Sequence, residues 1–223
     1  MKILAFDTST ELCSCALSVE GEIVYREQNA GQKHSEILLP MIDSMLAESR
    51  LRLTELTAIA YGRGPGSFTG LRITCGVAQG LSLGADLPVI GVDSLVALAE
   101  RADAHKVVAC IDARMGEIYH AAYQRHEDEW MCMSDPRVCK PELAPPIFGD
   151  EWSGCGSGFE RYREALLKCY GQQLSNISSG LLPRAFEIVR IAERRFTRGE
   201  AGDAENAVPL YLRDKVALKS SER

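Results

Sequence analysis

The residues best suited to chemistry lie in a glycine-rich stretch, YGRGPGSFTGLRI, at residues 61–73. Gly64 and Gly66 would let a ligand approach the backbone closely. A helix beginning near Ser67 would point free N–H groups and its positive dipole end at an anion, and Arg72 adds charge. The stretch therefore suggests a phosphate-binding loop, but it matches neither G-x-x-x-x-G-K-[ST] nor G-x-G-x-x-G. A tight strand-to-helix turn explains it equally well.

Two further polar turns follow strand-like segments. Asp7 and Ser9 end the first of these segments, and we expect Asp7 to cap nearby backbone donors there. Asp112, Arg114 and Glu117 lie in a second turn, IDARMGE, and could act as acid–base groups. We favour the interpretation that Asp112 and Arg114 form an ion pair between two lobes of the protein.

Residues that ligate metals are present but poorly placed for the purpose. The eight cysteines include no C-x-x-C pair. Cys13 and Cys15 share one face of a strand-like segment, where zinc is conceivable, but two small core residues are the preferred interpretation. His120 and His126 are too far apart for one strand face or one helical turn. No conventional metal site is predicted.

The elements that position these residues alternate between strand and helix. Strand-like segments at 2–6, 13–19 and 22–28 precede a helix at 35–48, a strand at 56–61, a helix at 67–83, a strand at 88–91 and a helix at 94–101. Further strands are expected at 107–111, 117–123 and 130–134, and helices at 159–170 and 184–197. This order predicts an α/β protein with mixed sheets flanked by helices. We predict a first lobe at 1–103 and a smaller second lobe at 104–223, with the last helix packing back on the first lobe.

Two helices of the first lobe carry candidate partner-binding residues. Interior glycines cost about 1 kcal/mol each relative to alanine, and Gly76 and Gly80 share one helix face, so close packing must offset that cost. The neighbour is either the protein's own sheet or a helix of a second protein. The stripe at Ile37, Met41 and Met45 leaves the same two alternatives. If the neighbour is a second protein, the predicted partner surface consists of Ile37, Met41, Met45, Leu71, Gly76 and Gly80.

Composition narrows the class of function. The formal net charge is -6, the pI is about 5.3, and Lys and Arg form no cluster. Because phosphate neutralisation supplies most nucleic-acid affinity, the chain is not expected to hold RNA by itself. Neither a secretory signal nor a membrane-spanning stretch is visible, so we expect a cytoplasmic protein.

Four motifs together resemble one family. The family is the bacterial TsaB (YeaZ) family, whose motifs are similar, in chain order, to the opening AFDTST, YGRGPGSFTGLRI at 61–73, IDARMGEIY at 111–119 and PLYLR at 209–213. The resemblance implies an actin-like ATPase fold with two ribonuclease-H-like lobes. It also implies a subunit that works with a paralogous catalytic subunit, TsaD, and an ATPase, TsaE, to form threonylcarbamoyladenosine next to the tRNA anticodon. In actin-like ATPases the turn that corresponds to Asp7–Ser9 wraps nucleotide phosphates.

The same resemblance bears on catalysis. TsaD carries a metal-binding His-x-x-x-His pair, and Ser94 and Leu98 fall at the corresponding positions here. Neither side chain replaces imidazole as a transition-metal ligand. We therefore expect a non-catalytic subunit without a cofactor of its own that activates a TsaD-like enzyme, contacts tRNA only indirectly and forms a homodimer when alone. The sequence leaves open whether ATP or ADP binds at the interface of the complex. The alternative is a stand-alone ATP-dependent transferase or metallopeptidase-like enzyme, in which Asp7, Arg72 and Asp112 converge on nucleotide and Mg²⁺.

Overall fold

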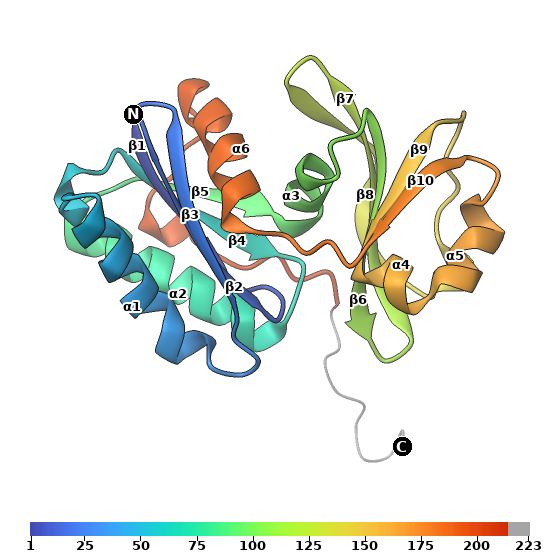
Figure 1. Cartoon of the computed structure of the whole chain (residues 1–223), viewed down its shortest axis with the longest axis horizontal. Coiled ribbons are helices and arrows are strands. Elements are labelled where there is room, and N and C mark those ends of the chain that lie inside the picture. Colours follow the sequence, from blue (N-terminus) through green and yellow to red (C-terminus); the bar gives the residue numbers. More distant parts are fainter. Residues whose placement is uncertain (214–223) are drawn as a thin grey trace.

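The computed structural model describes residues 1–213; residues 214–223 of the predicted second lobe lie outside the described part. Within that part the strands form two five-stranded sheets (Figure 1). The first sheet contains β1 (Lys2–Asp7), β2 (Leu12–Val19), β3 (Glu22–Asn29), β4 (Ala58–Gly64) and β5 (Val89–Asp93). The second contains β6 (Lys106–Arg114), β7 (Glu117–His126), β8 (Glu129–Cys139), β9 (Trp152–Gly156) and β10 (Leu174–Ser179).

The two sheets share one topology. The first has the order β3-β2-β1-β4-β5, with β1, β2 and β3 antiparallel and β4 and β5 parallel to β1. The second has the order β10-β9-β6-β7-β8, with three antiparallel strands and then two parallel ones. Three meandering strands followed by parallel additions therefore occur twice, which confirms the predicted mixed-sheet α/β architecture.

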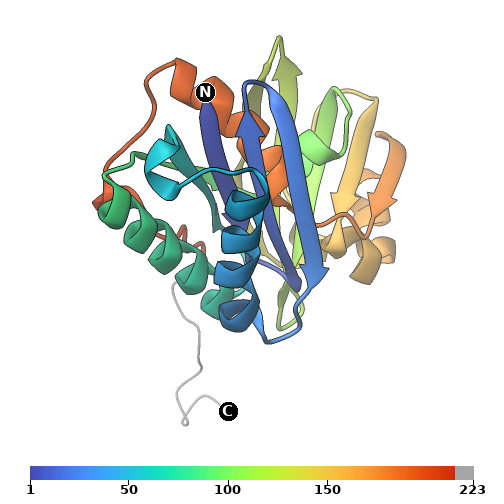
Figure 2. The same cartoon turned by 60° about the vertical axis from the view of Figure 1, so that its left-hand side comes forward.

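Helices cover both faces of each sheet. They are α1 (His34–Glu48), α2 (Phe68–Ala85), α3 (Ser94–Arg101), α4 (Ser157–Arg161), α5 (Arg163–Tyr170) and α6 (Ala185–Thr197), with short 3-10 turns at Leu53–Glu55, Pro141–Leu143 and Ala204–Asn206. Helices α1 and α2 lie side by side on the outer face of the first sheet (Figure 2). Helices α3 and α6 lie between the two sheets, and α4 and α5 cover the far face of the second sheet (Figure 1).

The alternation of strand side chains explains this layering. In β1, Leu4 and Phe6 join the core beneath α1 and α2, whereas Ile3 and Ala5 join the core beneath α6. Successive strand residues point to opposite faces, so a strand that is apolar throughout is buried on both. Helix α6 comes late in the chain but makes its sheet contacts with the first lobe. Within residues 1–213, no helix combines the length and apolar character needed to cross a bilayer.

Three element predictions differ from the structure. Strands β9 and β10 were not expected, since no strand was predicted after residue 134. A methyl group at Gly154 would lie 2.6 Å from the ring of Phe159, so close packing explains this glycine. The helix expected over 159–170 is two helices, because Tyr162 leaves helical geometry at φ −120°.

The two lobes are joined firmly on the side of α3 and α6. Glu100 of α3 is 4% exposed and lies at the junction. It accepts a hydrogen bond from Trp130 Nε1 of β8 at 2.8 Å and pairs with Arg194 of α6 at 3.1 Å. Burial opposes its charge, but the hydrogen bonds from Arg194 and Trp130 hold the pKa of Glu100 below its usual value. A second ion pair joins Arg198 of α6 to Glu129 of β8.

Candidate functional site

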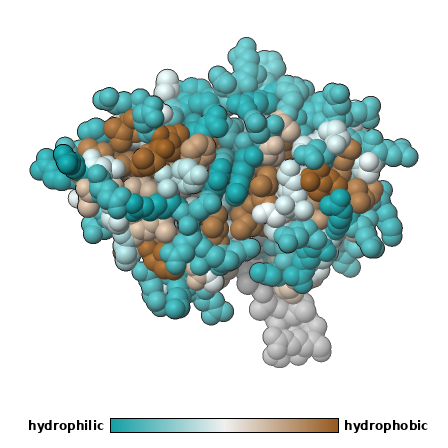
Figure 3. All heavy atoms as spheres, in the orientation of Figure 1, coloured by the Kyte–Doolittle hydropathy of each residue, from teal (hydrophilic) through white to brown (hydrophobic). Residues whose placement is uncertain are grey.

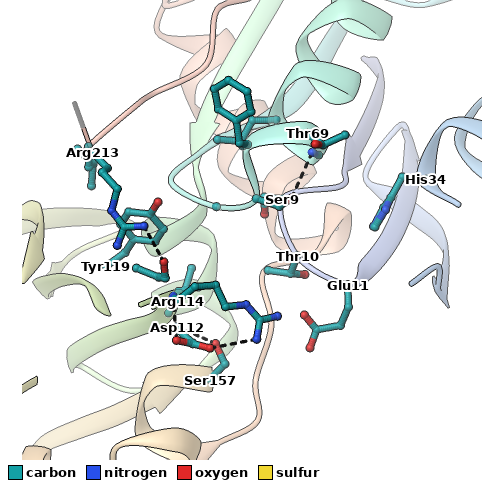
Figure 4. Close-up of a pocket in the computed structure, with 18 of the residues that line it drawn as sticks. Ser9, Thr10, Glu11, His34, Thr69, Asp112, Arg114, Tyr119, Ser157 and Arg213 are labelled. Carbon is teal, nitrogen blue, oxygen red and sulfur yellow. Dashed lines mark hydrogen bonds and ion pairs between the residues drawn. The ribbon is translucent and has the colours of Figure 1, made fainter. Parts of the chain in front are cut away.

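A cleft of about 1020 Å³ separates the glycine-rich stretch from the second lobe. Figure 4 shows Ser9 and Thr69 of the first lobe on one side of it and Asp112 and Ser157 of the second lobe on the other. His34, the first residue of α1, lines the same cleft with its Nε2 atom buried and without a hydrogen-bond partner among the described residues. The cleft thus brings together the glycine loop and the IDARMGE turn that sequence motifs singled out.

The glycine loop is filled by the protein's own chain. A methyl group at Gly66 would overlap Ser9, and one at Gly70 would overlap the carbonyl oxygen of Thr8. The backbone N–H of Ser67 donates to the carbonyl oxygen of Ser9 at 2.7 Å. The turn between β1 and β2 therefore packs against the side of the loop where a Cβ would lie, while Gly66 and Gly70 also line the cleft. Close packing against this turn accounts for glycine at positions 66 and 70.

Gly64 has a different neighbour. Its φ is +111°, a region that favours glycine, and a methyl group there would lie 2.9 Å from the carbonyl oxygen of Leu210 and from the side chain of Leu71. The backbone N–H of Leu210 donates to the carbonyl oxygen of Arg63 at 2.7 Å. The C-terminal segment thus closes the loop from the other side.

Asp7 is fully buried beneath the loop. Its Oδ2 accepts hydrogen bonds from the Ser9 hydroxyl at 2.8 Å and from the Ser9 N–H at 3.2 Å, as expected for a residue that caps local donors. Its Oδ1 faces Gly62 and has no hydrogen-bond partner among residues 1–213. Burial raises the pKa of the Asp7 carboxyl to about 6, although the bonds from Ser9 lower it. Asp7 is not among the residues that line the cleft.

Arg72 does not point into the glycine loop. Its guanidinium carbon lies 3.9 Å above the ring of Phe68, and its Nε donates to the hydroxyl of Tyr211 at 3.1 Å. Within the described part of the chain, Arg72 shares no ion pair with Asp7 or Asp112. The structure therefore does not assemble the three-residue nucleotide and Mg²⁺ site of the stand-alone enzyme hypothesis.

The IDARMGE turn forms the wall of the second lobe. Asp112 pairs with Arg114 at 3.4 Å and with Arg161 of α4 at 3.3 Å, and the hydroxyl of Tyr162 donates to it at 3.2 Å. The predicted Asp112–Arg114 ion pair is present, but the expectation that it joins two lobes is wrong: both residues belong to the β6–β7 hairpin. The contact between lobes in this region comes from Arg213, which pairs with Glu117 and donates to the carbonyl oxygen of Ala113 at 3.0 Å.

Ser94 and Leu98, which the family resemblance aligns with a metal-binding histidine pair, are both buried. Ser94 begins α3, is 0% exposed and donates to the Ser9 hydroxyl at 3.2 Å. Leu98, one turn later, is also 0% exposed and packs against the second sheet. Cys13 and Cys15 lie in the core beneath α1. Among the described residues, no three His, Cys, Asp or Glu side chains are arranged to hold a metal ion.

The buried histidine of the second lobe, His120, packs in the core of that lobe. His120 of β7 is 0% exposed, and its Nε2 lies 3.0 Å from the hydroxyl of Tyr170. Burial, together with the smaller effect of the charge of Arg137, lowers the pKa of His120 to about 4. His120 is therefore neutral near pH 7 and belongs to the core around α5.

The predicted partner surface divides into buried and accessible residues. Met45 and Leu71 are 3% and 1% exposed and belong to the core of the first lobe, so these two positions are removed from the surface. Ile37 and Met41 are half-buried. Gly76 and Gly80 are exposed, and a methyl group at either would meet no described atom within 4 Å.

The accessible face of α2 extends further than the sequence suggested. Gly84 is open in the same way as Gly76 and Gly80, and Leu83 is 75% exposed. Arg72 is the only charged residue in the 18 residues of α2. We define the α2 face by its exposed residues beyond Arg72, which are Gly76, Gly80, Leu83 and Gly84. Leu83 and Gly84 were missed because their exposure depends on which way the helix is rotated over the sheet.

Known proteins match nearly the whole chain. The family model described as TsaD, tRNA N6-adenosine threonylcarbamoyltransferase, matches residues 22–220. The tRNA threonylcarbamoyladenosine biosynthesis protein TsaB of Escherichia coli is 43% identical, covering 98% of this chain and 97% of that protein. Its Haemophilus influenzae counterpart is 38% identical, covering 98% and 96%, and its Bacillus subtilis counterpart is 33% identical, covering 96% and 94%.

Solved structures agree with these matches. A Pseudomonas aeruginosa protein described as similar to peptidase YEAZ superposes with a TM-score of 0.89 at 39% identity, covering 95% of this chain and 99% of that one. YeaZ from Pseudomonas aeruginosa superposes with a TM-score of 0.85 at 38% identity and the same coverage. The fold, the four motifs and these similarities over nearly the full length agree: the chain belongs to the TsaB (YeaZ) family.

Proposed function

We propose that this chain binds and activates a TsaD-like enzyme through the α2 face and does not itself catalyse the transfer. Membership in the TsaB family gives it a role in threonylcarbamoyladenosine biosynthesis. The observation that carries the proposal is the character of α2. Surface helices normally present charged or polar side chains to water, yet beyond Arg72 the exposed positions of α2 hold three glycines and a leucine.

Open glycines on a helix favour a helical partner. Without a Cβ, the backbone of a second helix can approach more closely than at a position with a side chain, and ridges of its side chains can enter the groove. Each glycine costs about 1 kcal/mol relative to alanine, and within residues 1–213 no internal contact offsets that cost at Gly76 or Gly80. The half-buried Ile37 and Met41 of α1, together with Ile73 and Val77 of α2, add apolar surface beside the glycines.

The non-catalytic role rests on residue chemistry. Ser94 and Leu98 occupy the two positions of the paralogue's histidine pair, and neither can replace imidazole as a metal ligand. Ser94 is already hydrogen-bonded to Ser9, and the chain itself fills the glycine loop. We propose that the catalytic metal belongs to the TsaD-like partner, that any ATP or ADP lies at the interface of the complex or on a TsaE-like ATPase, and that the partner subunits hold the tRNA.

The α2 face can also pair with itself. An uncharged helical face with open glycines is self-complementary, so two copies related by a two-fold axis can bury it. We propose a homodimer when the partner is absent, and competition between the two assemblies for one surface.

Figure 3 shows that most of the exposed face in that view is hydrophilic, with hydrophobic residues gathered in separate patches.

A reconstituted assay with single omissions tests the proposal. It contains the chain, a TsaD-like subunit, a TsaE-like ATPase, tRNA, ATP and the threonylcarbamoyl donor. We expect product only when the chain is present, and no product or ATP turnover from the chain alone. The Gly80→Leu variant should fold but fail to support product. Lys168→Leu, which places leucine on an exposed position of α5, should behave like wild type. Product without the chain, or product from the chain alone, contradicts the proposal.

A further inference from the structure

Residues 207–213 connect parts of the two lobes that no other segment within residues 1–213 joins. The lobes are covalently linked by residues 102–105 and 180–184, on the side of α3 and α6. After α6 the chain returns along the first lobe and crosses to the lower end of β6 (Figure 1). We define residues 207–213, which include the PLYLR motif, as the strap.

The first half of the strap is anchored in the first lobe. Ala207 is 0% exposed and belongs to the core beneath α2, and the hydroxyl of Tyr61 donates to the carbonyl oxygen of Asn206 at 2.9 Å. The Leu210 N–H donates to the carbonyl oxygen of Arg63, directly beside Gly64. Leucine at 210 therefore sits where the glycine loop leaves β4.

The second half touches α2 and then the second lobe. The Tyr211 ring lies 5.5 Å from the ring of Phe68, in the first turn of α2, and its hydroxyl accepts a hydrogen bond from Arg72. Two residues later, Arg213 pairs with Glu117 and donates to the carbonyl oxygen of Ala113. The Arg213 side chain is only 17% exposed, so this bridge is partly shielded from water. Figure 4 shows Arg213 beside Tyr119 at the rim of the cleft.

We propose that the strap fixes the opening of the cleft and links it to the α2 face, so that a protein bound along α2 senses the position of the second lobe. A charge-assisted bridge at Arg213 holds the β6–β7 hairpin, and Tyr211 transmits any displacement of that hairpin to Phe68 and Arg72. The α2 face begins one helical turn beyond Arg72. The second part of this inference rests on the proposed function; the first part does not.

The connection that the strap makes between the two lobes is tested by hydrogen–deuterium exchange on the full-length chain alone. In Arg213→Ala we expect the Leu210 amide and the amides of residues 113–117 to exchange about tenfold faster than in wild type, as for loss of a charge-assisted bond. The matched control is Arg198→Ala, which also removes an arginine that pairs across the lobes, but away from the cleft. It should leave these amides unchanged. Wild-type exchange in Arg213→Ala overturns the inference.

The coupling is tested with a purified TsaD-like subunit by calorimetry. Arg213→Ala and Tyr211→Phe should each weaken binding about threefold to tenfold, as for loss of one hydrogen bond. Arg198→Ala should bind like wild type. Unchanged affinity of both strap variants, together with faster exchange, overturns the coupling. If the wild-type chain does not bind the subunit, the proposed function fails, and the exchange experiment alone decides whether the strap ties the lobes.

Discussion

Glycines at the two ends of one stretch of chain have opposite surroundings. Gly66 and Gly70 are pressed against Ser9 and Thr8, so a side chain at either position has no space. Gly76 and Gly80, about two and three turns beyond Gly70 along α2, face open space. The first group explains how the β1–β2 turn packs onto the loop. The second group is not explained by anything inside the described part of the protein, which is why we assign it to a partner.

The largest expected effect concerns the packed group. Alanine normally stabilises a helix relative to glycine, but a Cβ at Gly70 would overlap the Thr8 carbonyl oxygen, which is backbone and cannot move aside easily. We expect Gly70→Ala to lower the free energy of unfolding by about 3 kcal/mol, the upper end of the usual cost of overpacking a core. Urea unfolding followed by circular dichroism measures this. A variant as stable as wild type would show that the loop is not filled by the chain.

The Asp7 carboxyl lies beneath the same loop and should make the stability of this region depend on pH. The pKa of Asp7 is raised by burial from 3.8 to about 6, so its contribution to stability is complete below pH 3.8 and is lost as pH rises through 6. The difference in unfolding free energy between Asp7→Asn and wild type should therefore grow by roughly 3 kcal/mol between pH 4 and pH 8. Urea unfolding across this range tests it. A difference that does not vary with pH would mean that the carboxyl is hydrated.

Substitution of the open glycines Gly76 and Gly80 by a bulky residue should weaken association with the partner rather than lower the stability of the fold. Gly80→Leu adds a bulky side chain where no described atom lies within 4 Å of the new Cβ, so folding should be preserved. Binding to a TsaD-like subunit should weaken at least about a hundredfold, equivalent to about 2.7 kcal/mol, because the partner helix can no longer approach. Calorimetry measures the affinity, and Lys168→Leu is the control. Intact binding by a folded Gly80→Leu variant would remove this face from the proposal.

The smallest effect runs opposite to the first. Gly76→Ala should raise the free energy of unfolding of the isolated chain by about 0.5–1 kcal/mol, because alanine favours the helix and meets no neighbour. Thermal or urea unfolding at low protein concentration measures it, so that self-association does not contribute. A destabilised variant would indicate an internal contact and would erase the distinction between the two groups of glycines.

Periodicity predicted most of the fold. Strands β1 to β8 and helices α1, α2, α3 and α6 follow clear apolar patterns, and the structure confirms them. Strand β9 escaped because Gly154, Cys155 and Gly156 carry no β-branched side chain; small residues are required there by Phe159 and Cys110. The contact of Gly156 with Cys110 joins residues far apart in sequence and leaves no local periodic signal.

The candidate surface was harder to predict than the helices that carry it. Residues four apart on a helix are rotated by about 40° from one another, so the stripe from Ile37 to Met45 turns by about 80°. Ile37 and Met41 are therefore half-buried, while Met45 reaches the core. The glycine loop posed the same difficulty in another form. A glycine that makes room for a ligand and a glycine that makes room for the protein's own backbone look the same in a sequence. Only the tertiary contacts with Thr8, Ser9 and Leu210 show which kind is present here.

The position of α6 has a consequence for how the chain can be divided. Alanines of the first sheet, Ala5, Ala16 and Ala60, are covered by Ile188 and Ala192, which come after the whole second sheet in sequence. The N-H of Ala185 also donates to the hydroxyl of Ser14 at 2.9 Å. The first lobe is thus a discontinuous folding unit, with the second inserted into it. A fragment ending at residue 103 would expose this alanine-lined face to water. The first lobe therefore cannot reach its full stability when the chain is cut after residue 103.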